Sequence, residues 1–163
     1  MNNQYSIKNF LPLIIIVAII VIATITKQLV AHTWDVHAVM YDFMGLFFIV
    51  FGSFKIINLS MFAQAYASYD LIAARSTVYA HAYPFIELTL GILYLLRLYP
   101  MFTNSAVLII MLISTAGVAL ALSKQEEITC ACLGDLFKIP MTYVTLLEDL
   151  AMTLMAGFML LFS

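Results

Sequence analysis

Five runs of about 20 mostly apolar residues dominate this sequence and limit what it can fold into. They cover residues 10–31, 38–57, 79–96, 101–122 and 141–162. A helix needs an apolar stretch of this length to cross the hydrocarbon core of a bilayer. The alternating pattern of a membrane β-barrel is missing from these runs, so helices are the expected spanning structure. The sequence therefore predicts an all-α membrane protein with five spans.

The composition supports a membrane location and excludes nucleic-acid binding. Of the 163 residues, 64% are hydrophobic and 10% are charged, whereas a soluble domain carries about 25% charged residues. Seven Lys/Arg and nine Asp/Glu give a net charge of −2, and no basic cluster is present to displace phosphate counterions. The two cysteines are too few for a disulfide-dense secreted scaffold. We therefore expect the lipid bilayer, and no nucleic acid, as a partner.

Two connectors between the runs are long, residues 60–78 and 123–140. The first has four apolar residues at helical spacing, and Ser60 is a candidate N-cap for a helix there. These apolar residues are Phe62, Tyr66, Tyr69 and Ala73. The pattern predicts an amphipathic helix, which either lies in the membrane interface or packs on the bundle from the aqueous side.

Two glutamates are expected at matched depths in the membrane. If the five spans alternate in direction, both long connectors lie on the same side. Glu87 then lies eight residues into the third span, and Glu148 lies seven residues into the fifth. At 1.5 Å per residue both carboxyls are roughly 10–12 Å deep. Ionisable groups at such depths usually face the bundle interior or a wet cavity, so the two acids predict one shared site.

Other ionisable residues on the same side are candidates for acid–base or structural roles at this site. Asp149 follows Glu148, Lys55 lies at the end of the second span, and His81 lies near the start of the third. The alternative interpretation is that the glutamates are protonated packing residues, or that they pair structurally with Lys55 or His81. Structural pairing also perturbs titration, so both interpretations stay open.

The most informative local motif is the pair Cys130 and Cys132 in the second long connector. As a redox pair, one thiolate attacks a partner disulfide and the other thiol resolves the mixed disulfide. As a metal site, two thiolates suit Cu(I) or another thiophilic ion, although they fall short of the four ligands of structural zinc. The third interpretation is two unreactive thiols near a helix start.

Two alternative functions follow from other features. One stripe of the fifth span carries Glu148, Met152, Met155 and Met159. Thioethers can bind copper, but methionine is also a common gap-filler in apolar packing. With the CxC pair, this stripe motivates a component that binds or transports copper- or mercury-type metals. The small size and the lack of a cofactor motif motivate a non-catalytic membrane assembly subunit.

Six short motifs, in the same order along the chain, resemble those of a known family. The sequence has GSFK at 52–55, YDLIA at 69–73, YPFIEL at 83–88, CACLG at 130–134, KIP at 138–140 and VTLLED at 144–149. This set resembles the methylamine-utilisation MauE family of DoxX-like redox-associated membrane proteins, over about residues 40–160. The linked CxCLG and Glu-Asp motifs are its most specific part.

The resemblance implies a fold and a role. The fold is a DoxX-like four-helix membrane bundle over residues 38–163, preceded by an extra transmembrane helix and its connector over residues 1–37. The role is thiol-redox assistance to disulfide formation, processing or maturation of a partner protein, alongside a thioredoxin-like protein. The family's named member is linked to the disulfide-rich small subunit of methylamine dehydrogenase.

The resemblance also assigns residues. It carries redox roles onto Cys130 and Cys132, and it implies relevance for Lys55, Glu87 and the Glu-Asp pair at 148–149. No resident cofactor is expected, and a quinone or a thiophilic metal stays open.

The expected location is the bacterial cytoplasmic membrane, but the side of the CxC connector stays open. One side carries Lys8, Lys55, Arg75, Lys124 and Lys138, and the other carries Lys27 and Arg97. The positive-inside rule puts the five cations and the cysteines in the cytoplasm. Disulfide chemistry instead belongs on the oxidising, extracytoplasmic side.

Overall fold

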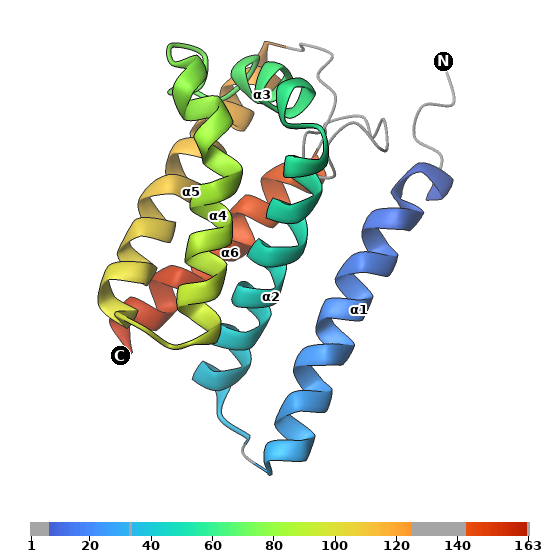
Figure 1. Ribbon diagram of the computed structural model, residues 1–163, viewed down its shortest axis with the longest axis vertical. Coiled ribbons are helices and arrows are strands. Elements are labelled where there is room, and N and C mark those ends of the chain that lie inside the picture. The colour runs from blue at the N-terminus through green and yellow to red at the C-terminus, as the bar shows by residue number, and fades with distance from the viewer. Residues whose placement is uncertain (1–6, 33, 125–142, 163) are drawn as a thin grey trace.

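The computed structural model describes residues 7–32, 34–124 and 143–162, and in these it contains six α-helices and no strand. The helices are α1 (Ile7–Ala31), α2 (Val36–Ile57), α3 (Leu59–Ala67), α4 (Thr77–Leu95), α5 (Pro100–Ser123) and α6 (Tyr143–Leu161). Helices α1, α2, α4 and α5 run roughly along the long axis of the molecule and α6 crosses it obliquely, whereas the short α3 lies across one end, here called the α3 end (Figure 1). The all-α prediction is confirmed, and each predicted span corresponds to one long helix.

Among the residues that the structure describes, three helices are long and apolar enough to cross a membrane. They are α1 over Leu11–Ala31, α2 over Val36–Ile57, and α5 over Pro100–Ser123. In lipid, backbone N–H and C=O groups must be satisfied within the chain, which makes a helix the required conformation for such segments. The helices α4 and α6 have 19 residues each and carry the ionisable groups of the third and fifth apolar runs.

Three of the helices begin at residues that favour a helix start. The Asp35 carboxylate accepts from the backbone N–H groups of His37 and Ala38 at the start of α2, and the Ser76 hydroxyl accepts from Tyr79 N–H at the start of α4. These side chains satisfy donors that a helix leaves free in its first turn. Pro100 opens α5, where the lack of an N–H costs no helical hydrogen bond.

The helices α2 and α4 pack against each other with unusually close backbones. A Cβ added to Gly91 of α4 would lie 3.0 Å from the carbonyl oxygen of Gly45 on α2, and one added to Gly52 would lie 3.3 Å from the carbonyl oxygen of Pro84. Small residues allow such close contact between membrane helices. Gly45 and Gly52 of α2 and Gly91 of α4 therefore permit the close approach of the two helices.

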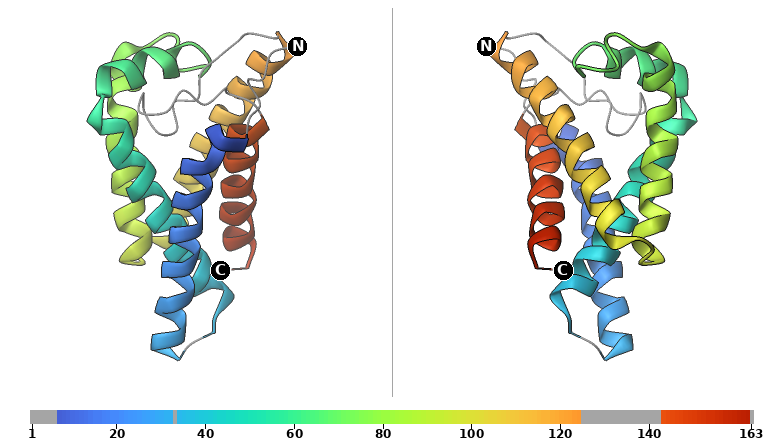
Figure 2. Two further views of the ribbon diagram at one scale, coloured as in Figure 1. Left: turned by 90° about the vertical axis from the view of Figure 1, so that its right-hand side faces the viewer. Right: turned by 90° about the vertical axis from the view of Figure 1, so that its left-hand side faces the viewer.

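A second pair, α5 and α6, completes the bundle through a buried apolar cluster. This cluster contains Met44 and Phe48 from α2, Leu90 and Tyr94 from α4, Val107 and Met111 from α5, and Met152, Ala156 and Met159 from α6. Figure 2 shows α2 and α5 close together near the end opposite α3 and diverging toward the α3 end. Polar side chains of both pairs line a cavity between them.

The first helix joins the bundle along α2 through a buried polar contact. Asp42 of α2 is fully buried and accepts hydrogen bonds from Lys27 Nζ at 2.5 Å and Gln28 Nε2 at 2.8 Å. Both donors lie on the last turns of α1, which is separated from α2 by a short turn. The charge of Asp42 is therefore neutralised by the neighbouring helix.

The helix expected in the connector 60–78 differs from its prediction in start and length. It begins at Leu59 after Asn58, whose side chain makes no capping hydrogen bond, so Ser60 is not the N-cap. It ends at Ala67, because a separate turn stabilised by Asp70 begins there. The four predicted apolar positions are all buried. The apolar face packs on α4, and the position of this helix relative to the membrane interface stays a prediction.

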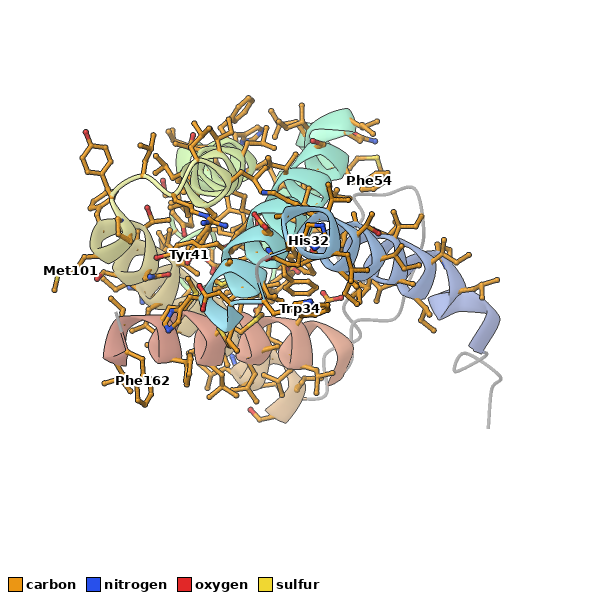
Figure 3. The ribbon with its side chains drawn as sticks, turned by 90° about the horizontal axis from the view of Figure 1, so that it is seen from below. His32, Trp34, Tyr41, Phe54, Met101 and Phe162 are labelled. Atoms are coloured by element: carbon orange, nitrogen blue, oxygen red, sulfur yellow. The ribbon has the colours of Figure 1, made fainter. Side chains whose placement is uncertain are left out.

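The end opposite α3 exposes aromatic and sulfur-containing side chains. Figure 3 views this end, with His32 and Trp34 at the turn between α1 and α2, Met101 at the start of α5 and Phe162 after α6. The Trp34 side chain is 70% exposed. Tryptophan favours the boundary between lipid and water, so this position suits an interfacial anchor.

Gly117 of α5 offers a direct test of how the turn after α3 packs on the bundle. A Cβ at this position would lie 2.5 Å from the carbonyl oxygen of Tyr69 and 3.2 Å from Cα of Asp70. Gly117→Ala must therefore displace backbone, and such overpacking costs about 1–3 kcal/mol. We expect a lower free energy of unfolding in mixed micelles.

The matched control for this substitution is Gly157→Ala on α6. The nearest atom to a Cβ there is Leu108 Cδ1 at 3.9 Å, which is an ordinary contact. Alanine gains up to about 1 kcal/mol in helix propensity over glycine, so this variant should be as stable as the parent or more stable. Equal stability of the two variants would contradict the packing described for Gly117.

Candidate functional site

A polar cavity of about 40 Å³ lies inside the bundle near the α3 end. Helices α2, α4, α5 and α6 surround it and α3 covers it, where the two helix pairs diverge (Figures 1 and 2). Its polar lining consists of Lys55, Tyr66, Tyr69, Tyr83, Glu87, Ser114, Glu148 and Asp149, and the rest is phenylalanine and methionine. A polar cavity of this size has room for water. One cationic and three acidic side chains therefore meet inside an otherwise apolar bundle.

A buried ion pair forms one wall of the cavity. Lys55 Nζ of α2 lies 2.5 and 2.6 Å from the two carboxylate oxygens of Glu87 on α4. The two side chains are only 11% and 5% exposed. The ammonium also lies 5.5 Å from the ring centroid of Phe62 and 5.1 Å from that of Tyr83. Ring faces attract cations, so Lys55 is held both by its carboxylate partner and by aromatic rings.

Two consecutive acids of α6 form the facing wall. Glu148 and Asp149 both line the cavity, since side chains one residue apart on a helix point about 100° from each other and can flank the same space. Asp149 Oδ2 accepts a hydrogen bond of 2.7 Å from the Ser114 hydroxyl of α5. This bond fixes the Asp149 side chain across the α5–α6 contact.

Three tyrosines in mutual contact, Tyr66, Tyr69 and Tyr83, line the cavity at the α3 end. The ring centroids of Tyr66 and Tyr83 are 4.4 Å apart, and Tyr69 meets Tyr66 edge to face at 5.5 Å. The Tyr66 hydroxyl donates to Asp70 at 3.0 Å. Burial, followed by the neighbouring Tyr83 and Asp70, raises the pKa of Tyr66. The hydroxyl therefore stays protonated and remains a donor to Asp70.

The structure brings together four of the site residues expected from sequence. Lys55, Glu87, Glu148 and Asp149 all line the one cavity, as expected from their matched depths. His81 does not line it: its side chain is exposed on α4, with Nδ1 at 2.8 Å from the Thr77 carbonyl oxygen.

The expected redox pair cannot be placed in the same way. Cys130 and Cys132 lie outside the described residues. The structural description of the site therefore covers the cavity and its charged groups, and the role of the two thiols stays a prediction.

Several cavity residues were not singled out as site residues from the sequence. Ser114 lies in the fourth span, which has no charge and no motif, so nothing in the sequence marks it. Tyr66 was identified only as part of an apolar pattern, and Tyr83 only as part of the YPFIEL motif. A tyrosine on an apolar helix face can indicate a buried polar site, because a buried hydroxyl needs a hydrogen-bond partner.

Within the described residues, the cavity shows no arrangement typical of a metal site. Excluding residues 125–142, no group of three or more His, Cys, Asp or Glu side chains is arranged to bind a metal ion. Met152 and Met159 of the predicted methionine stripe pack in the apolar cluster with Met44 and Met111. Their thioethers therefore serve apolar packing in this structure.

The Lys55–Glu87 pair can be tested by a double-mutant cycle. Lys55→Met or Glu87→Gln alone leaves one buried charge without its partner, and breaking a buried pair in this way costs about 3–5 kcal/mol. The double variant removes both charges and should lose much less than the sum of the single losses. The free energy of unfolding in mixed micelles is measured for the parent, the two single variants and the double variant. Strictly additive losses of this free energy would show that the two groups do not interact.

Comparison with known proteins gives one match. Residues 10–162 match the family described as Methylamine utilisation protein MauE. The matched region begins within α1 and runs to the residue after α6, so it includes most of α1, the other five helices and both cysteines. No curated protein and no solved structure matches the chain. Because the family match covers nearly the whole sequence, the chain belongs to the MauE family of membrane proteins.

Proposed function

We propose that this protein is a thiol-redox protein of the bacterial cytoplasmic membrane that assists disulfide formation, processing or maturation of a partner protein. Cys130 and Cys132 are its exchanging thiols. The observation that carries the proposal is the position of the acid-lined cavity at the end of the bundle to which the CxC segment is attached.

The connectivity supports this assignment. Helix α5 ends at Ser123 and α6 begins at Tyr143, both at the α3 end (Figures 1 and 2). The segment that joins them contains the two cysteines, and Cys130 follows Ser123 by only seven positions. The chain therefore tethers the dithiol to the end of the bundle where Lys55, Glu148 and Asp149 lie.

The exchange reaction uses both thiols. The thiolate of one cysteine attacks a disulfide sulfur of the partner, the partner's S–S bond breaks, and a mixed disulfide forms. The second cysteine then attacks this bond, so that the CxC pair becomes a disulfide and the partner gains two thiols. The reverse sequence oxidises a partner dithiol. The partner is a thioredoxin-like protein or the maturing redox protein itself.

The cavity supplies groups suited to this chemistry. A thiol must lose its proton before it attacks, and the carboxylates of Glu148 and Asp149 can accept that proton. Lys55 is the one cation among the described residues that line this cavity, and its charge balances that of Glu87. Glu87 holds Lys55 in place at 2.5 Å, which makes it a positioning residue in this proposal.

The proposed topology has five spans. Helices α4 and α6, at 19 residues each, are about 28 Å long, close to the roughly 30 Å of a hydrocarbon core. They lie beside the two spanning helices α2 and α5, which cover their polar residues. Five alternating spans put α3 and the segment between α5 and α6 on one side of the membrane.

The thiol role predicts a trapped intermediate. In a Cys132→Ser or a Cys130→Ser variant, the cysteine that remains can attack the partner but no intramolecular thiol resolves the product. One of the two single variants should therefore accumulate a mixed disulfide, visible as a reductant-sensitive band on a non-reducing gel. The double serine variant is the control, and it should form no such band.

Two outcomes would contradict the thiol role. If the double serine variant still supports partner maturation, the function is non-catalytic assembly. If the purified reduced protein retains Cu(I) or Hg(II) near stoichiometrically and forms no mixed disulfide, metal handling replaces thiol exchange.

The acid role predicts a slower exchange in Glu148→Gln. Proton transfer by a positioned side chain contributes about 10²–10⁴-fold to a rate, so we expect at least about 10²-fold slower formation of the mixed disulfide. Stopped-flow mixing with a model disulfide measures this rate. Asp35→Asn is the control, because asparagine also caps a helix and Asp35 lies at the opposite end of the bundle. An unchanged rate for Glu148→Gln would remove the carboxylate from the proposed chemistry.

A further inference from the structure

A second cavity lies at the α3 end, outside the bundle interior. It has a volume of about 220 Å³ and lies between the turn that follows α3 and the last turns of α5. Arg75 lines it from the turn, and Lys124 lines it from the end of α5. Leu120 and Ala121 form an apolar wall next to Lys124. Two cations from different segments of the chain thus share one hollow with an apolar side.

The turn that carries Arg75 is held firmly against α5. Its backbone packs on Gly117, where the absence of a side chain lets the Tyr69 carbonyl approach the helix. Asp70 accepts from the N–H groups of Ile72 at 2.9 Å and Ala73 at 2.8 Å. These contacts make the position of the turn, and of Arg75 at its end, a built feature of the fold.

The acid Asp70 also lines this cavity, and both of its carboxylate oxygens already accept hydrogen bonds. Asp70 is fully buried, and besides the two N–H groups of the turn it accepts from the Tyr66 hydroxyl at 3.0 Å. Two donors from the turn and one from α3 therefore stabilise its negative charge. Arg75 and Lys124 are exposed, by contrast, and their charged groups can reach a ligand.

The cavity lies where a lipid head group would be. Helix α5 is an uncharged 24-residue span that ends at Ser123, and Lys124 is the next residue. An apolar helix of that length brings its end to the boundary between hydrocarbon and water. Basic residues at this boundary attract anionic lipids, and basic pockets between membrane helices bind their head groups.

We propose that Arg75 and Lys124 bind a phosphate group in this cavity, supplied by the head group of an anionic phospholipid. The guanidinium can donate two parallel hydrogen bonds to phosphate oxygens, and the ammonium adds a point charge. The apolar wall at Leu120 and Ala121 offers contact to the acyl chains. A free phosphate ion presents the same oxygens but has nothing to place against that wall.

The test is a titration of the purified full-length protein in a mild detergent. The probes are a short-chain phosphatidylglycerol, a short-chain phosphatidylcholine and inorganic phosphate, and the thermal unfolding midpoint reports binding. We expect phosphatidylglycerol to raise the midpoint most. Each cation near a membrane surface contributes enough for about a fivefold change in affinity. Arg75→Gln and Lys124→Gln should therefore each raise the half-saturating concentration of phosphatidylglycerol about fivefold.

A control and a conservative variant make the result specific to the site. Arg97→Gln removes an exposed cation from the turn between α4 and α5 and should leave the titration unchanged. This turn lies at the end opposite α3 (Figure 1). Arg75→Lys keeps the charge and loses the paired hydrogen bonds, so its affinity should lie between those of the parent and Arg75→Gln.

Each remaining outcome overturns the proposal. Equal responses to phosphatidylglycerol and phosphatidylcholine would exclude an anionic head group as the ligand. Equal responses to phosphatidylglycerol and inorganic phosphate would assign the site to a soluble phosphate. An unchanged response in the Arg75 and Lys124 variants would place lipid binding elsewhere on the molecule.

Discussion

A charged side chain buried inside an apolar bundle needs an opposite charge within contact distance. In this protein Lys55 and Glu87 meet that requirement for each other. The two residues come from α2 and α4, whose backbones are brought together by Gly45, Gly52 and Gly91. Without that close approach, the ammonium and the carboxylate would each be buried alone, at a large desolvation cost. The glycine contact and the ion pair therefore depend on each other.

The rest of the site is arranged around this pair. Phe62 of α3 and Tyr83 of α4 place their rings beside the lysine ammonium. The contact of Phe62 helps to hold α3 over the end of α2 and α4. The acids of α6 face the pair across the cavity, and Ser114 orients one of them. The result is a small polar cavity whose charged groups all come from helices.

The sequence predicted the long helices well, because an apolar run in lipid has few alternatives to a helix. It also predicted that Glu87 and Glu148 share a site, since depth along alternating spans follows from counting residues. From the sequence, the glutamates could pair with either Lys55 or His81. Only the fold decides between them, because Lys55 faces α4 whereas His81 lies on the exposed side of its helix.

Other features depend on tertiary contacts that no local pattern contains. The helix α3 ends earlier than its apolar spacing suggests, because Asp70 organises a new turn that buries Tyr69 and Ala73 by another route. Ser114 belongs to the site only because α5 and α6 pack side by side. The contact of Asp42 with Lys27 and Gln28 follows from the short turn between α1 and α2, but the apolar pattern alone does not indicate it.

That last contact has a consequence for biogenesis. An aspartate emerging alone into hydrocarbon would hold α2 back at the membrane surface, whereas an aspartate matched with a lysine and a glutamine of the preceding helix enters with its charge already balanced. The donors of α1 are synthesised before Asp42, and the turn between the helices is short enough to bring them together. The first two helices are thus suited to enter the bilayer as one hairpin, and the bundle that surrounds the ion pair can then assemble on α2 from within the lipid.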